Sequence, residues 1–179
     1  MNRELLVASL KVYNTSDDEK LFIPRFLDLL RHPNAFQRDH LPGHITGSAW
    51  IVDSTRNFVL LTHHAKLNRW LQPGGHADGD ENIVNVALRE AVEETGLKDL
   101  KLLNNEVFDV DIHTIPRRNE FPEHLHYDVR FILEGNRNHP LQLSAESHAL
   151  QWVSFDQLKS ITKENSSILR MADKARLLF

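Results

Sequence analysis

A glycine-rich loop followed by a helix with three clustered glutamates constrains this 179-residue chain more than any other feature of its sequence. The loop occupies residues 73–81 (PGGHADGDE), and the helix is predicted from about Asn82 to Thr95, where Gly96 supplies the usual C-terminal signal. Glu90, Glu93 and Glu94 have the i, i+3, i+4 spacing that places side chains on one helix face. The opposite face is apolar and consists of Val84, Ala87, Leu88, Ala91 and Val92. This pattern predicts a helix fixed against a core by the face opposite the carboxylates.

The three glutamates are unfavourable together unless a cation accompanies them. Like charges at this spacing repel one another and weaken the helix, and anions near a helix C-terminus oppose its macrodipole. Oxygen ligands suit hard ions, which favours Mg²⁺ or Mn²⁺ over zinc. The glycine pair at 74–75 lets the backbone approach the same place, so a main-chain carbonyl is a further candidate ligand. The alternative is a solvated acidic helix face, where most glutamates lie.

The full spacing of the segment favours the metal site. Gly75 is followed after five residues by Glu81, after seven more by Arg89–Glu90, and then by Glu93–Glu94 and Gly96–Leu97. Residues 75–97 resemble a complete Nudix box, and the chain is therefore identified as a member of the Nudix hydrolase superfamily. Ala91 is the one departure, because a larger aliphatic residue is commoner there, and it concerns packing rather than the carboxylates.

The resemblance implies a divalent-metal-dependent hydrolase, with Mg²⁺ or Mn²⁺ as cofactor. It would cleave a diphosphate (pyrophosphate) linkage in a substrate of the nucleoside diphosphate-X type, by attack of metal-activated water on phosphorus. Arg89 is implied to orient a glutamate, and one of Glu90, Glu93 and Glu94 to act as the base. The implied metal ligands are the carbonyl of Gly74 and the carboxylates of Glu81, Glu90, Glu93 and Glu94.

A second interpretation is a catalytically weak Nudix module that binds a nucleotide as a sensor. Such modules usually lose box glutamates, and this chain keeps all of them. An isopentenyl-diphosphate-isomerase-like enzyme is disfavoured, because its catalytic cysteine is missing from a chain without cysteine. Many Nudix enzymes also draw one acid from outside the box, and Glu120, Glu123 and Glu146 are the candidates here.

A histidine-rich hairpin over residues 109–130 is the second cluster of polar residues. Strand alternation places Asp109, Asp111 and His113 on one face of the first strand, and His124, His126, Asp128 and Arg130 on one face of the second. We interpret this polar surface as the substrate pocket, and its predicted substrate-binding residues are His113, Arg117, His124, His126, Asp128 and Arg130. Two alternatives stay open: an outward-facing sheet surface, and a zinc site at His113, His124 and His126.

The pattern of helices and strands predicts an α/β or α+β fold, a Nudix-like mixed β-sheet sandwiched between helices. Two helices are expected within an N-terminal extension, residues 1–43, the second starting at a capping box that begins at Ser16. Residues 44–179 form the predicted Nudix domain. Its expected strands are 45–52, 58–64, 101–103, 107–115, 125–133 and 149–153, with helices at 155–160 and from about Asn165.

Composition limits the partners. The chain has 21 basic and 25 acidic residues, a formal net charge of −4, which argues against a general nucleic-acid or membrane-surface binder. No apolar run reaches the length of a membrane span or signal peptide, so a cytoplasmic location is expected, with a small nucleotide-diphosphate substrate as partner and a homodimer as a possibility. Residues 74–96 hold six acids and one base, so the negative excess is concentrated in the loop and helix.

Overall fold

The structure is a computed structural model that describes residues 1–14, 17–117 and 121–179. Contacts divide the chain into two compact units, each of which is described by itself. Unit 1 comprises Met1–Ser48, Gly75–Ala87 and Asn105–Phe131. Unit 2 comprises Ala49–Gly74, Leu88–Asn104 and Ile132–Phe179.

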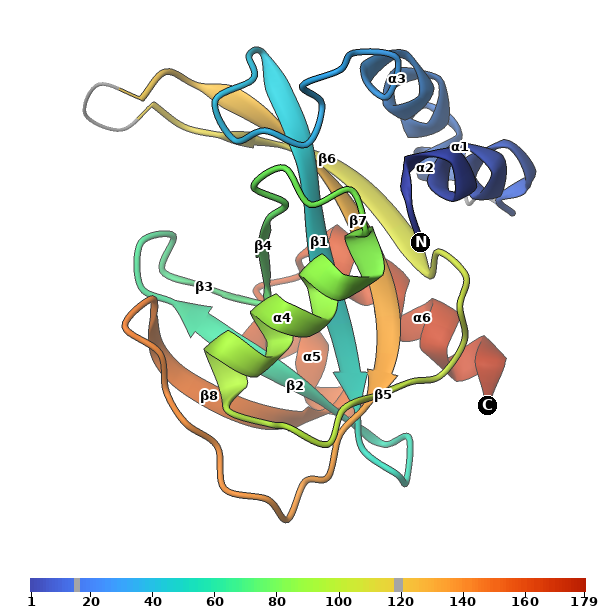
Figure 1. The fold of residues 1–179 in the computed structure, drawn as a ribbon. Helices are drawn as coiled ribbons and strands as arrows, with labels where there is room; N and C mark the ends of the chain where they lie inside the picture. The colour runs from blue at the N-terminus through green and yellow to red at the C-terminus, as the bar shows by residue number, and fades with distance from the viewer. Residues whose placement is uncertain (15–16, 118–120) are drawn as a thin grey trace. The chain divides into compact units, whose positions relative to one another are not determined.

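The helices lie near the positions that the sequence predicts (Figure 1). They are α1 (Arg3–Val12), α2 (Asp17–Lys20), α3 (Phe22–Leu29), α4 (Ile83–Thr95), the short 3-10 helix η1 (Phe155–Gln157), α5 (Leu158–Ile161) and α6 (Ser166–Leu178). The predicted second helix is divided in two before Pro24, which lies in the first turn of α3, where proline is tolerated. The predicted cap residue Ser16 lies outside the described residues. None of the described helices has the length and apolar character needed to cross a membrane.

The strands are β1 (Gly43–Val52), β2 (Phe58–His64), β3 (Arg69–Leu71), β4 (Gly74–His76), β5 (Lys101–Leu102), β6 (Asp109–Ile115), β7 (His124–Glu134) and β8 (Ser147–Ser154). They form one sheet with the order β3-β2-β1-β7-β5, in which β4 pairs with β1, β6 with β7 and β8 with β2. The expected hairpin is confirmed, because β1 and β2 are antiparallel with Ile51 opposite Leu60. β3 and β4 were not predicted; β3 lies just before the glycine-rich loop and β4 at its start.

Unit 1 is held together by apolar packing between its N-terminal helices and its strands. Leu6, Leu10 and Phe26 are fully or almost fully buried, and the Phe26 ring meets Tyr127 of β7 edge-on at 5.3 Å. Glu19 is buried too, and its Oε1 accepts a hydrogen bond from the backbone N–H of Val110 in β6. The N-terminal helices therefore pack against β6 and β7 within this unit.

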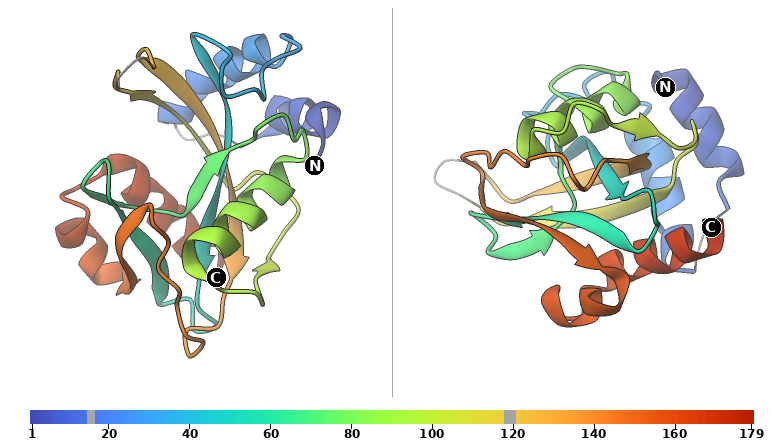
Figure 2. Two further views of the ribbon diagram at one scale, coloured as in Figure 1. Left: turned by 60° about the vertical axis from the view of Figure 1, so that its left-hand side comes forward. Right: turned by 90° about the horizontal axis from the view of Figure 1, so that it is seen from below.

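Unit 2 contains a separate apolar core and the carboxylate end of α4. β2 and β8 lie side by side along their whole length in this unit (Figure 2), with Phe58 opposite Ser154 and Thr62 opposite Leu150. The core cluster consists of Ala49, Ile51, Leu60, Ala91, Leu97 and Leu133. Ala91 is fully buried, so the small residue in the box is a packing feature, as the sequence suggests.

Candidate active site

The end of α4 fixes the backbone around the box glutamates. Gly96 ends the helix with φ 74°, a left-handed conformation that glycine adopts without strain. A Cβ atom at this position would lie 2.6 Å from Cβ of Gln142, so a side chain would also collide with a neighbouring segment. The glycine is thus required both by its backbone angle and by the close approach of residue 142.

Glu94 is the most enclosed of the three box glutamates. Its carboxylate accepts a hydrogen bond of 3.2 Å from the backbone N–H of Gly74, and its side chain is buried. Burial raises the pKa of Glu94 to about 7, an effect that the Gly74 hydrogen bond opposes and that the charges of Glu90 and Glu146 increase. The box carboxylate and the glycine backbone therefore meet, as the sequence predicts.

Arg89 lies against the other two box glutamates. Its Nη1 is 2.7 Å from Oε1 of Glu90 and 3.4 Å from Oε2 of Glu93. Burial raises the pKa of Glu90, against the effect of Arg89, while the side chain of Glu93 is 58% exposed. We call Gly74, Glu90, Glu93 and Glu94 the carboxylate site.

Of the three candidate acids outside the box, the structure brings Glu146 close to this site. Its charge contributes to the raised pKa of both Glu90 and Glu94. Glu123 is exposed in unit 1, and Glu120 lies outside the described residues. Among the candidates that the structure describes, Glu146 is thus the one that shares the electrostatic environment of the box glutamates.

Glu81, the predicted outer metal ligand, belongs to unit 1. Its Oε1 forms an ion pair of 2.6 Å with Nη2 of Arg3 in α1, and its side chain is 45% exposed. The same arginine donates to the backbone carbonyls of His32 and Pro33. Within unit 1, Glu81 connects the loop before α4 to the N-terminal helices.

The predicted substrate face of β6 and β7 contains a buried charge network. The two strands are antiparallel, with Asp109 opposite Arg130, Asp111 opposite Asp128 and His113 opposite His126. Arg130, only 3% exposed, is bonded to Asp109, Asp111 and Asp128 at 2.7 to 3.1 Å. Burial alone would lower the pKa of Arg130, but the three carboxylates raise it above its ordinary value.

Two neighbouring hydroxyls complete this network. Thr46 and Ser48 of β1 both donate to Oδ1 of Asp128, at 3.0 and 2.7 Å. Asp128 and Arg130 therefore hold β1, β6 and β7 together through buried contacts, whatever further role they have. Four other residues were predicted as substrate contacts, and two of them are largely accessible. His113, at the edge of this network, is 40% exposed and paired with Asp111, and Arg117 is exposed.

His124 and His126 belong to a group that the sequence only partly predicts. One ring nitrogen from each of His44, His76, His124 and His126 lies within 4.8 Å of the others. We call these four residues the histidine cluster. Local spacing identified the pair on β7 but not His44 of β1 or His76 of β4, and His113 of the predicted zinc triplet is not part of the group.

Burial is the main cause of pKa shifts within the histidine cluster. It lowers the pKa of His44 and of His76 to about 4, and that of His126 to about 2. Neighbouring imidazoles lower each value further, because a second positive charge nearby disfavours protonation. The rings of His44, His76 and His126 are therefore neutral at physiological pH.

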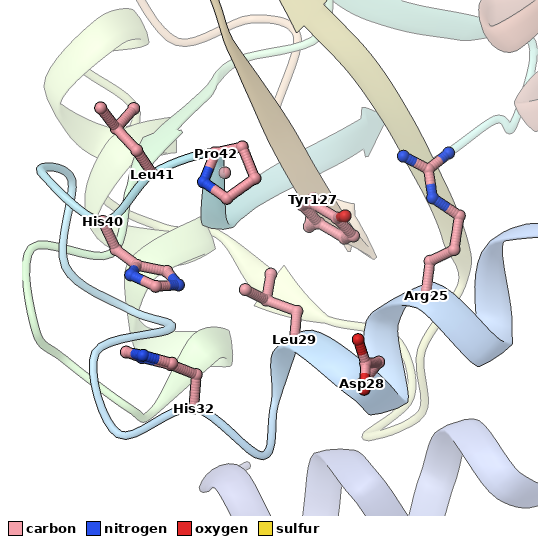
Figure 3. Close-up of a pocket in the computed structure, with 9 residues that line it drawn as sticks. Arg25, Asp28, Leu29, His32, His40, Leu41, Pro42 and Tyr127 are labelled. Carbon is pink, nitrogen blue, oxygen red and sulfur yellow. The ribbon is translucent and has the colours of Figure 1, made fainter.

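Unit 1 also contains a surface cavity that the sequence does not predict (Figure 3). Its volume is about 440 Å³. Arg25, Asp28 and Leu29 of α3 line one side, and Tyr127 of β7 contributes an aromatic ring. None of the predicted site residues lines this cavity.

Comparison with known proteins identifies the family of this chain. The NUDIX domain family model matches residues 44–172. The chain therefore belongs to the Nudix family and is a Nudix-type pyrophosphohydrolase.

The chain is similar to hydrolases with different named activities. A bis(5'-nucleosyl)-tetraphosphatase (asymmetrical) of Rattus norvegicus is 30% identical over 107 residues, which cover 60% of this chain and 70% of the relative. A probable DHNTP pyrophosphohydrolase of Lactococcus lactis subsp. cremoris is 28% identical over 137 residues, or 75% of this chain and 80% of the relative. The solved structure of a C. elegans Ap4A hydrolase binary complex has a TM-score of 0.60 at 16% identity, over 75% of this chain and 96% of that chain, which supports the fold alone.

Proposed function

We propose that this protein hydrolyses a diphosphate linkage in a nucleotide-type substrate, and that the carboxylate site holds the hard divalent cation that the reaction needs. The observation that carries this proposal is the burial of Glu94 against the Gly74 N–H, with Glu90 beside it and paired to Arg89. The two relatives are named a tetraphosphatase and a pyrophosphohydrolase, and both names describe cleavage within a chain of phosphates. A nucleoside carrying such a chain is the substrate class that we infer.

The donor set fits Mg²⁺ or Mn²⁺. Sheltered carboxylates that raise one another's pKa are destabilised as anions, and a hard divalent cation relieves that repulsion through oxygen ligands. Glu90, Glu93, Glu94 and the Gly74 backbone would hold the ion. When bound, it would neutralise phosphate oxygens and lower the pKa of the attacking water.

The chain's own residues supply orientation and proton transfer. Arg89 holds the Glu90 carboxylate in one orientation, and the Gly74 N–H holds that of Glu94. Thr62 adds a side-chain hydrogen bond to Glu94, and its own hydroxyl is hydrogen-bonded to Ser147. One of the box glutamates accepts the proton of the attacking water, and Glu146 adds negative charge beside them.

The direct test is a panel of substrates with Mg²⁺ or Mn²⁺, including a dinucleoside tetraphosphate, a pterin triphosphate, a cap analogue and a nucleoside diphosphate sugar, with products identified by phosphorus NMR. We expect at least one compound to be cleaved within its phosphate chain. Glu90→Gln and Glu94→Gln should each lower kcat by at least about 100-fold, since a lost metal ligand forfeits several kcal/mol of transition-state stabilisation.

Glu4→Gln is the matched control, because Glu4 is an exposed glutamate of α1 and its variant should retain full turnover. Wild-type turnover in both box variants would contradict the proposed function. Tight nucleotide binding without cleavage of any compound in the panel would instead support a sensor module.

A further inference from the structure

We propose that the histidine cluster of unit 1 is a second metal site, which binds a late first-row divalent cation, Zn²⁺ foremost. It is built from His44, His76, His124 and His126 and contains none of the box carboxylates. The inference is independent of the proposed function, because it depends on a different set of residues.

The spacing of the ring nitrogens suits a tetrahedral ion. Nitrogen ligands lie 2.0–2.1 Å from zinc, so two ligands of a tetrahedral site are about 3.3 Å apart. Nε2 of His124 and Nε2 of His126 are 3.3 Å apart, which is the length of one tetrahedral edge. All four candidate nitrogens lie within 4.8 Å of one another, so no pair has to close by more than about 1.5 Å to reach the length of a tetrahedral edge.

Hydrogen bonds on the far side of two rings select the tautomer that a metal needs. Nδ1 of His124 faces the carbonyl oxygen of Pro122 at 3.0 Å, and Nδ1 of His44 faces that of His40 at 3.4 Å. A carbonyl only accepts, so each Nδ1 carries the hydrogen and each Nε2 presents a lone pair. Metal-binding histidines are oriented in this way, with the second ring nitrogen donating to a carbonyl or carboxylate.

Nε2 of His44 provides a separate observation. The residue is fully buried, and among the described residues this nitrogen has no hydrogen-bond partner. A buried polar atom without a partner costs about 1–3 kcal/mol. A hydrogen bond between His124 and His126 would satisfy those two rings but would leave His44 unsatisfied, whereas a shared cation satisfies all three.

The donors also determine the class of ion. Four imidazoles suit Zn²⁺, Cu²⁺, Ni²⁺ and Co²⁺, while Mg²⁺ and Ca²⁺ require oxygen ligands. The ligands come from three strands of unit 1: β1, β4 and β7. A bound ion would cross-link these strands and stabilise the unit.

The test uses the full chain stripped of metal with a chelator. We expect it to bind one Zn²⁺ with an affinity measured by chromophoric competition, and Co²⁺ to give the intense visible bands of a tetrahedral site. His76→Gln and His126→Gln, both at half-buried positions, should weaken zinc binding by about 10- to 100-fold or more. His148→Gln, an exposed histidine outside the cluster, is the matched control and should bind zinc as the wild type does.

A box variant separates this site from the carboxylate site. Glu90→Gln combined with Glu94→Gln should leave zinc affinity unchanged. The proposal would be overturned if the box variant lost zinc while His76→Gln and His126→Gln kept it. It would also be overturned if the wild type did not bind zinc stoichiometrically. X-ray absorption on the zinc-loaded wild type needs no variant: a shell of nitrogen ligands at about 2.0 Å supports the site, and a shell dominated by oxygen contradicts it.

Discussion

The histidine cluster and the carboxylate site both bury titratable groups, but burial shifts the pKa values of the two sites in opposite directions. In unit 1, burial lowers the pKa of His44 and His76 to about 4. In unit 2, burial raises the pKa of Glu94 to about 7. The cause is the same in both, because a low-dielectric environment disfavours whichever form is charged. The histidines thereby become neutral nitrogen donors. The glutamates, by contrast, are oxygen donors whose charged carboxylate form needs a nearby positive charge to be stable.

The Arg130 network differs from both, because its charges are already paired within the protein. Replacing Arg130 by methionine would leave the buried Asp109 and Asp128 and the partly buried Asp111 facing one another. It should lower the free energy of unfolding by about 3–5 kcal/mol. Urea denaturation measures this loss, which is the largest effect we expect. Arg130→Lys should recover only part of the stability, since one ammonium does not reproduce contacts to Asp109, Asp111 and Asp128. If Arg130→Met were as stable as the wild type, the ion pairs of Arg130 would contribute nothing to the free energy of unfolding, and the contrast with the two other sites would fail.

The carboxylate site should show the next largest effect in the metal-free protein. The folded-state pKa of Glu94 is raised from 4.5 to about 7, so the stability linked to its neutral form is present below about pH 4.5 and lost as pH rises through about 7. Glu94→Gln removes this loss and should raise the free energy of unfolding at pH 8 by on the order of 1–3 kcal/mol in the presence of EDTA. Denaturation curves of wild type and variant across this pH range check the sign. Destabilisation of the variant at pH 8 would mean that the carboxylate is favourably paired without metal.

The histidine cluster should respond in the opposite direction. The folded-state pKa values of His44 and His76 are lowered from 6.5 to about 4, so their contribution to stability is present above about pH 6.5 and lost as pH falls through about 4. Between about pH 6.5 and pH 4, His76→Gln should lose less unfolding free energy than the wild type, by about 1 kcal/mol. His148→Gln should keep the wild-type slope. If wild type, His76→Gln and His148→Gln all showed the same dependence of unfolding free energy on pH, the contrast between the histidine cluster and the carboxylate site would be contradicted.

The sequence predicted features that are local in the chain. The three glutamates, their shared face and the stop at Gly96 lie within one helix, and helical geometry alone determines their relation. Strand alternation likewise predicted that Asp128 and Arg130 share a face, which the register of β6 and β7 confirms. It did not reveal that these residues are buried in a shared network with Thr46 and Ser48 of β1, because that depends on strand pairing between distant segments.

The same limit explains the histidines. His44 and His76 join His124 and His126 only because β1 is the neighbour of both β7 and β4 in the sheet. Alternation placed His113 with the pair on β7, but its ring nitrogen pairs with Asp111 instead. β3 and β4 were missed for a related reason: each has three residues, too few to show a period of two.

The central claim is that the carboxylate site holds the cation that supports hydrolysis. The most direct measurement is the hydrolysis rate of the best substrate as a function of Mg²⁺ concentration, in wild type and in Glu94→Gln. The account predicts a saturable dependence on Mg²⁺ in the wild type and, in the variant, a kcat lower by at least about 100-fold at saturating Mg²⁺. Coincident curves for the two proteins would contradict it.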